Sequence, residues 1–286
     1  MKRIFVIVIA AFTIITFSFG QNRELKFTTP FYDAVDQWVA FDKNAKDSTY
    51  LFGFIYIDED AGFTVDLGGR FVIENNGSRK LSEDLKQNEN IKIRLGQNTA
   101  NVTILSDEEI NQLNLSKIPD WLKYYKESQN ENSYLVKIGL LYNSVGASHH
   151  AFKPLLEVYE KEPHFKGLEF ELAYAYNATK QFDKAIIVLN KAIENDTANF
   201  WYYRELGFSL VNQNKLDEAE KVYLQGIKLS NDKLQKAEMA INMAQSYFKV
   251  KNKPKFEEWA NITKEYADKD SEYYAYINYF EQNWDK

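Results

Sequence analysis

The sequence contains 286 residues, of which 45% are hydrophobic, 15% aromatic and 27% charged. This composition is too apolar for a disordered chain and predicts a protein that buries at least one sizeable core. The net charge is −6 and no basic stretch stands out, which argues against binding to nucleic-acid phosphates. The chain has no cysteine and only three histidines, which rules out disulfides and thiolate chemistry. We therefore expect neither a metal ion nor another cofactor.

Residues 1–20 are predicted to form a secretory signal peptide. Two basic residues, Lys2 and Arg3, precede an apolar run over residues 4–17, and small residues then precede Gln21. The run is shorter than the roughly 20 apolar residues that span a bilayer, which favours cleavage over a retained anchor. An exported chain without cysteine suits a bacterial envelope, periplasmic or extracellular. We expect no stable membrane insertion after cleavage.

Residues 21–118 are predicted to form a small α+β domain built on an antiparallel sheet. An amphipathic helix is expected over residues 33–41. Apolar residues then alternate along the chain, with turns expected at residues 58–62 and at Gly68 and Gly69. The first strand should be covered on both faces, because both of its faces are apolar. The expected strands span residues 50–57, 63–67, 70–74, 91–95 and 102–105, and a helix spans residues 107–113.

Three carboxylates of this domain could carry chemistry. Asp58, Asp60 and Asp66 surround Gly62 in a spacing that partly matches a calcium-binding loop. The later ligands of such a loop are missing, so an acidic hairpin tip is favoured. A hydrolase or carbohydrate-binding module remains the alternative, and it requires these carboxylates to converge on a pocket.

A linking helix is expected over residues 119–131, and residues 132–286 are predicted to be helical repeats. The sequence matches itself when it is shifted by 34 residues. Five positions recur in three copies: Ile138, Leu172 and Leu206; Gly139, Ala173 and Gly207; Tyr142, Tyr176 and Leu210; Ala151, Ala185 and Ala219; and Leu155, Leu189 and Tyr223.

These matched positions resemble the tetratricopeptide repeat (TPR) family, here in an exported bacterial form. The resemblance implies two antiparallel helices per repeat, stacked into an α-solenoid, with small residues where the helices approach closely. Pro154 removes a backbone hydrogen bond from the second helix of the first copy unless that helix begins late, near Lys153, so this copy is expected to be irregular. A longer connection over residues 230–236 is expected to displace the fourth copy. A last helix should close the stack with an apolar stripe formed by Tyr273, Ile277, Phe280 and Trp284.

In such a stack, the first helices of successive repeats line a concave face. The resemblance therefore implies a concave groove, and the residues that would line it make this groove aromatic with few charges, which suits an apolar peptide or a partner helix. The alternative is that these aromatic residues pack against the chain's own N-terminal domain or last helix. A clamp for a terminal carboxylate is not favoured, because only Arg204 and two asparagines could serve. The groove residues are Val136, Leu140, Asn143, Phe170, Tyr174, Asn177, Trp201, Arg204, Phe208, Val211, Ile241, Gln245 and Phe248.

The sequence carries no convincing catalytic motif. His149 and His150 are adjacent, point about 100° apart on a helix, and have no third ligand at a suitable spacing. Ser230 and Ser246 start Ser-x-x-Lys tetrads, but the matching Lys-Thr-Gly motif is absent. We therefore predict an exported, non-catalytic TPR scaffold that binds a protein or peptide partner. The alternatives are a catalytic or sugar-binding N-terminal domain on a repeat platform, and a purely structural envelope subunit.

Overall fold

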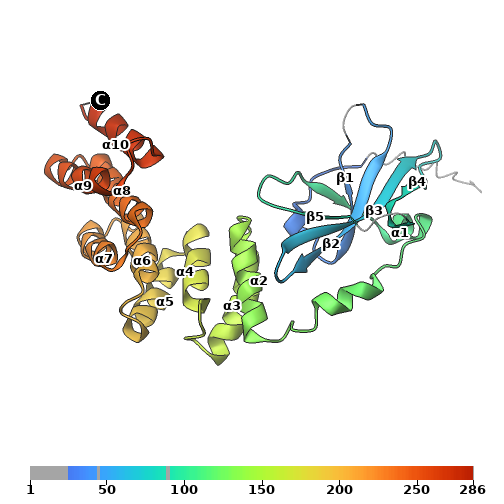
Figure 1. The fold of residues 1–286 in the computed structure, drawn as a ribbon, viewed down its shortest axis with the longest axis horizontal. Helices are drawn as coiled ribbons and strands as arrows, with labels where there is room; N and C mark the ends of the chain where they lie inside the picture. The colour runs from blue at the N-terminus through green and yellow to red at the C-terminus, as the bar shows by residue number, and fades with distance from the viewer. Residues whose placement is uncertain (1–24, 44–45, 88–90, 286) are drawn as a thin grey trace, which may run out of the picture.

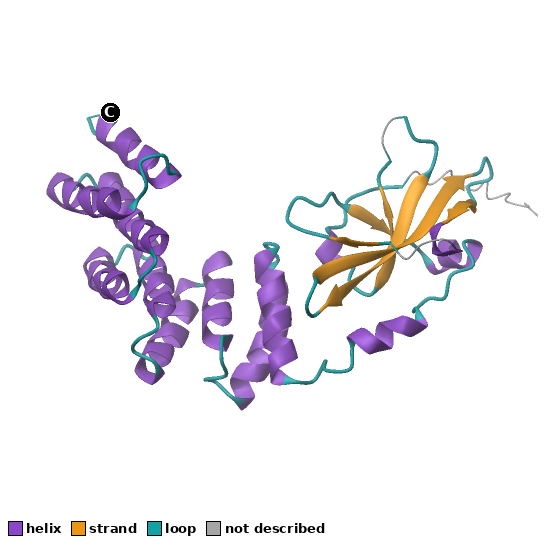
Figure 2. Cartoon of the chain, viewed as in Figure 1, coloured by secondary structure: helices purple, strands orange, loops and turns teal. Residues whose placement is uncertain are grey.

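A computed structural model of the chain describes residues 25–43, 46–87 and 91–285. The predicted signal peptide lies outside the described residues. A sheet domain occupies one end of the molecule, and a curved row of paired helices extends from it (Figure 1). Figure 2 shows strands confined to the first part and helices filling the second, as the sequence predicts.

The N-terminal domain is an antiparallel sheet with the order β4-β3-β2-β1-β6, and β5 also pairs with β3. Trp38, Phe52, Phe54, Tyr56 and Phe71 form a core on one face, while other residues of the same strands join a second core. The central strand is thus buried on both faces, as predicted. The strands are β1 (Gln37–Phe41), β2 (Tyr50–Asp58), β3 (Gly62–Ile73), β4 (Arg79–Asp84), β5 (Lys92–Arg94) and β6 (Val102–Ile104).

Short helices surround this sheet. Helix α1 begins after a capping box in which Ser106 accepts a hydrogen bond from the backbone N–H of Glu109, and the Glu109 side chain accepts one from Ser106 in return. Within the segment predicted as a linking helix, the structure has a 3₁₀ helix. These elements are η1 (Phe31–Asp33), η2 (Leu85–Gln87), α1 (Asp107–Gln112) and η3 (Asp120–Tyr125).

The predicted helix over residues 33–41 is wrong, because most of that segment is strand β1. Trp38, Val39 and Ala40 are buried, and the strand lies between β2 and β6. The residue pattern of this segment fits a helix, but hydrogen bonding to β2 and β6 stabilises it as a strand, since tertiary context overrides local propensity.

Gly68 and Gly69 do not form the predicted turn. Both lie inside the continuous strand β3, near irregularities in its pairing with β2 and β4. A Cβ at Gly68 would overlap the ring of Phe52, and one at Gly69 would overlap the carbonyl oxygen of Glu83. These glycines therefore permit close approach of neighbouring groups within a strand.

The C-terminal part consists of paired helices followed by a single helix. The first helices of successive pairs contact one another, α2 with α4, α4 with α6 and α6 with α8. The helices are α2 (Asn132–Ser144), α3 (Ser148–Lys161), α4 (Leu168–Ala178), α5 (Phe182–Asn195), α6 (Phe200–Asn212), α7 (Leu216–Leu229), α8 (Lys233–Lys249), α9 (Lys253–Tyr266) and α10 (Glu272–Gln282).

The first and fourth repeats each depart from the regular pattern. Helix α3 begins at Ser148 and continues through Pro154, which has no N–H to donate to the preceding turn. Burial of Ala151 and Leu155 against the neighbouring helices offsets this lost hydrogen bond. The connection before α8 is short, and the three extra residues of the fourth copy instead lengthen α8 itself.

Both ends of the stack are covered. At the N-terminal end, the ring of Phe63 from the β2–β3 hairpin packs on Tyr142 of α2 with a centroid separation of 5.2 Å. At the C-terminal end, α10 packs on α8 and α9, which confirms its predicted position. Such caps matter because an internal repeat exposes apolar surface wherever it lacks a neighbour.

Candidate protein-binding face of the repeats

Three large apolar side chains occupy the same position in successive repeats. Leu140, Tyr174 and Phe208 are 34 residues apart, on α2, α4 and α6, and are 37%, 37% and 38% exposed. Gln245 occupies the matching position on α8 and is also exposed. We call Leu140, Tyr174 and Phe208 the exposed row. Its repetition on helices that contact one another presents apolar surface along the stack.

An aromatic cluster extends this row at its centre. Phe170 lies one turn before Tyr174, and their ring centroids are 6.5 Å apart. Its ring also meets that of Trp201 edge-on at 5.7 Å. Trp201 is 36% exposed and Phe170 is half-buried, so the cluster offers partly accessible aromatic surface. Aromatic side chains of this kind are typical anchors at protein interfaces.

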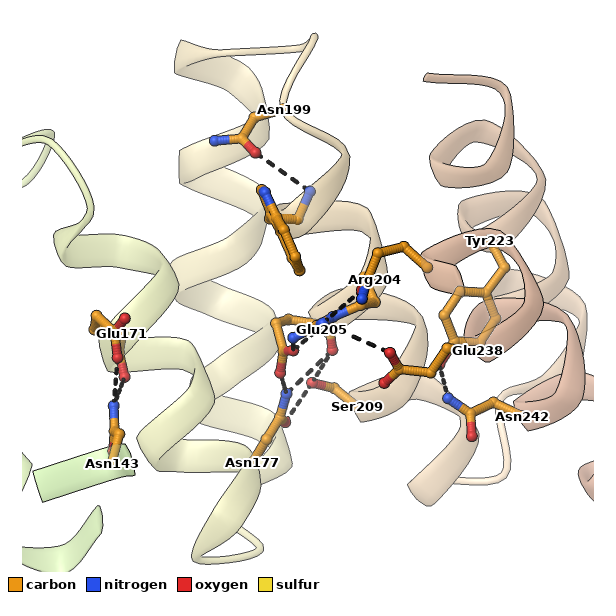
Figure 3. Close-up of polar contacts among 12 residues, drawn as sticks. Asn143, Glu171, Asn177, Asn199, Arg204, Glu205, Ser209, Tyr223, Glu238 and Asn242 are labelled. Atoms are coloured by element: carbon orange, nitrogen blue, oxygen red, sulfur yellow. Dashed lines mark hydrogen bonds and ion pairs between the residues drawn. The ribbon is translucent and has the colours of Figure 1, made fainter. Parts of the chain in front are cut away.

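Arg204 is already engaged by its own chain. Its Nη2 lies 2.7 Å from Oε1 of Glu205, and its Nη1 donates to Oε1 of Gln235 at 2.7 Å. The guanidinium also stacks over Trp201, with its Cζ 4.6 Å from a ring centroid. Figure 3 shows Arg204 between Glu205 and Glu238. The Oε2 of Glu238 is 3.7 Å from the Nη1 of Arg204. Burial raises the pKa of Glu238, although Arg204 partly opposes that rise.

Asn143 and Asn177 are buried and connect neighbouring repeats. Asn143 donates from Nδ2 to the carbonyl and the Oε2 of Glu171, at 2.9 and 2.8 Å. Asn177 makes the same two bonds to Glu205, at 3.1 and 2.9 Å (Figure 3). The two asparagines do hold carboxylates, but those of the next repeat. They therefore cannot serve as ligands for a partner.

The sequence offered a signal for this pairing that our prediction missed. Each glutamate follows its asparagine by 28 residues, and both pairs are separated by the repeat period of 34. Burial raises the pKa of Glu171, while the hydrogen bond from Asn143 opposes the rise. A buried carboxylate requires such partners, because leaving it without them costs about 2 to 3 kcal/mol of folding free energy or more.

The groove does not remain open to its C-terminal end. Phe248 lies against Phe280 of α10 and against Trp284, two residues after that helix ends, with centroid separations of 4.9 and 5.4 Å. Phe248 is half-buried by these contacts. For this residue, the alternative interpretation is correct, because it packs against the chain's own C-terminal end.

The remaining groove positions divide between the two environments. Gln245 is exposed, whereas Val136 and Ile241 are buried at 8% exposure and Val211 is half-buried. Fewer residues are therefore accessible along this face than the sequence predicts for the groove.

Two of the three aspartates of the sheet domain, Asp58 and Asp66, have separate partners. Asp58 accepts hydrogen bonds from the backbone N–H groups of Asp60 and Ala61, which closes the predicted hairpin turn. Asp66 is buried and its Oδ2 lies 3.0 Å from Nζ of Lys86. The carboxylate of Asp58 thus stabilises a turn, and that of Asp66 forms an ion pair.

The two adjacent histidines do have a third potential ligand, contrary to the sequence prediction. Asp33 of η1 approaches them from the sheet domain, and its Oδ1 lies 2.5 Å from Nε2 of His150. The separation of 117 residues explains why spacing along the sequence could not find it. His164 lies apart in sequence and pairs with Glu169, with 2.9 Å between Nδ1 and Oε1.

The paired helices and their shared exposed face define a helical-repeat protein. Residues 170–199 match the family model of the tetratricopeptide repeat. This match confirms a tetratricopeptide repeat at the place where the residue pattern predicts one, and the flanking helix pairs contact their neighbours in the same way. Stacked helical repeats of this kind present extended surfaces that typically bind other proteins.

Solved structures of TPR type resemble part of this chain. A thermophilic TPR protein of Thermus thermophilus is 16% identical over 57% of this chain and 87% of its own, with a TM-score of 0.48. MamA MSR-1 is 19% identical over 57% and 83%, with a TM-score of 0.41. MamA AMB-1 is 19% identical over 54% and 80%, with a TM-score of 0.40. No curated protein matches the sequence.

Proposed function

We propose that the protein is a non-catalytic scaffold that binds an apolar segment of a partner protein along the exposed row. The observation that carries this proposal is the equal exposure of Leu140, Tyr174 and Phe208 at one repeated position. Apolar side chains spaced along adjoining helices match the regular anchors of an amphipathic helix or an extended peptide. The aromatic cluster of Phe170 and Trp201 supplies the centre of this surface.

The chemistry of the face favours an apolar ligand over a terminal carboxylate. Arg204 is the one cation among the predicted groove residues, and its guanidinium is shared by Glu205, Gln235 and Glu238. Freeing it would leave Glu205, a buried carboxylate, with fewer hydrogen bonds, which opposes its release. Partner side chains that insert between aromatic rings require no such rearrangement.

We further propose that the chain is exported and acts in the periplasm or outside the cell. The basic residues followed by the apolar run of residues 4–17 support this location. Among the described residues, no helix is both long and apolar enough to span a bilayer. Mass spectrometry of the protein from its host tests the proposal. A chain that begins at Gln21 is expected, whereas a chain that retains residues 1–20 would contradict export with cleavage.

Site-specific photo-crosslinking tests the binding face. A photo-reactive amino acid at Tyr174 should capture a partner in intact cells, because this side chain is exposed at the centre of the row. Ile187 on α5 is the matched control, since it is apolar and more exposed, at 58%, but lies on a second helix. Capture at Tyr174 and not at Ile187 supports the proposal. Capture at Ile187 alone would place the interface on the opposite helices.

A further inference from the structure

Three metal-ligating side chains meet where the sheet domain contacts the first repeat. Asp33 comes from η1, while His149 and His150 lie in the first turn of α3. Their potential ligand atoms all lie within 4.8 Å of one another. Within the part of the chain that the structure describes, this is the one group of three or more such side chains with that proximity.

The two imidazole rings converge although they belong to adjacent residues. Their centroids are 4.1 Å apart, and both rings pack edge-on against Tyr32, at 6.2 and 6.0 Å. Tyr142 of α2 lies against His150 at 5.1 Å. These aromatic contacts from two separate elements restrict the imidazoles, and Tyr32 is the chain neighbour of Asp33. Tyr32 thus contacts both rings and Tyr142 contacts His150, while Asp33 and His149 are exposed to solvent.

We propose that Asp33, His149 and His150 bind a divalent transition-metal ion of the zinc type. Imidazole nitrogen and carboxylate oxygen are donors that Zn²⁺ prefers, whereas Ca²⁺ and Mg²⁺ prefer oxygen alone. Bonds of about 2.0 to 2.2 Å in a tetrahedral site place ligand atoms about 3.3 Å apart. The short contact between Asp33 and His150 must open by less than about 1 Å, and the longer separations must close, which side-chain rotation permits.

The metal site would have an open coordination position. Three protein ligands leave the fourth position of a tetrahedral ion for water. A pocket of about 330 Å³ adjoins the histidines and provides room for that water, with Tyr142, Lys153 and Glu157 in its lining.

The ion would tie two separate parts of the chain together. Asp33 belongs to the sheet domain and the histidines to the first repeat, so all three ligands are available only when these parts are docked. Binding therefore favours the docked arrangement by mass action. This extends the contact that Phe63 and Tyr142 already make between the same parts, and it is independent of the proposed binding face.

Calorimetric titration of the untagged, chelator-treated full chain with Zn²⁺ tests this site. We expect one ion per chain, and at least about tenfold weaker binding in each of Asp33→Asn, His149→Gln and His150→Gln. His164→Gln is the matched control, because His164 is the third histidine of the chain and lies outside the group. This variant should bind as tightly as the unaltered protein.

Two further readouts separate loss of ligands from loss of folding. Each variant should keep the melting temperature of the metal-free protein, and the same Zn²⁺ concentration should raise that temperature more in the unaltered protein and in His164→Gln than in the three ligand variants. Co²⁺ added to the unaltered protein should give the visible absorption bands of a tetrahedral site. Absence of saturable Zn²⁺ binding would overturn the proposal. Equal binding in all three ligand variants would overturn it as well.

Discussion

Close contact between Gly207 and Tyr223 predicts the effect of one added methyl group. A Cβ at position 207 would lie 2.5 Å from Cδ1 and 2.6 Å from Cζ of the Tyr223 ring. An unstrained contact requires about 3.5 Å, so the two helices or the ring must move by about 1 Å. Tyr223 is completely buried among the residues of the repeat core, so its ring has no exposed side. Overpacking in Gly207→Ala should lower the free energy of unfolding by about 3 kcal/mol. The higher helix propensity of alanine should offset about 1 kcal/mol of that loss.

The second repeat shows how this cost can be relieved. It already has Ala173 and Leu189 at the corresponding positions, and both residues are completely buried. The double variant Gly207→Ala with Tyr223→Leu should therefore be at least about 1 kcal/mol more stable than the sum of its single changes predicts.

Urea unfolding followed by circular dichroism measures all four members of this cycle. We expect a net loss of about 2 kcal/mol for Gly207→Ala alone and a favourable coupling with Tyr223→Leu. Strict additivity would refute the claim that the glycine is needed because of this particular ring. A stabilised Gly207→Ala protein would refute the packing argument altogether.

Three other substitutions test the separate parts of the account. Trp201→Ala should lower the free energy of unfolding by no more than about 2 kcal/mol, because Trp201 is partly exposed. Trp259→Ala, at a completely buried residue, should lower it by about 3 to 5 kcal/mol. Similar losses in urea unfolding would mean that Trp201 belongs to the core. Asn177→Ala should destabilise the protein by about 2 to 3 kcal/mol, because it leaves the buried carboxylate of Glu205 with fewer hydrogen-bond donors. Asn212→Ala, at an exposed residue, should change the free energy of unfolding by no more than about 0.5 kcal/mol. Equal effects would show that Asn177 does not stabilise the contact between repeats. Burial raises the pKa of Glu171, so the folded state binds a proton more tightly than the unfolded state does. The stability of the unaltered protein, measured relative to that of Glu171→Gln, should therefore rise as the pH falls from 7 towards 5. A pH-independent difference between these two proteins would contradict that cause.

The repeat architecture was predictable because its rules act over short distances. A small residue at Gly139 or Gly207 and a large one 16 residues later pack within the same helix pair, so the sequence alone indicates their contact. The strands were harder to predict. Strand β4 lies outside the predicted set because residues 79–84 are mostly polar and exposed at the sheet edge, with no apolar alternation.

The candidate sites depend on contacts that sequence spacing does not encode. Position 143 of the first helix falls in the groove register, yet Asn143 is buried because Glu171 of the next repeat lies beside it. Asp33 reaches the histidine pair only through docking of the sheet domain. Phe248 also depends on distant residues, since the helix that covers it begins more than 20 residues later. Exposed positions such as Tyr174 were predictable because the repeat period alone sets them.

The affinity of a captured partner for variants of the exposed row tests the central claim most directly. Tyr174→Ser and Phe208→Ser should each weaken binding by about 30-fold or more, since loss of an aromatic anchor costs about 2 kcal/mol. Ile187→Ser on the second helices should leave the dissociation constant unchanged. If Ile187→Ser weakens binding while both row variants bind normally, the exposed row is not the binding face.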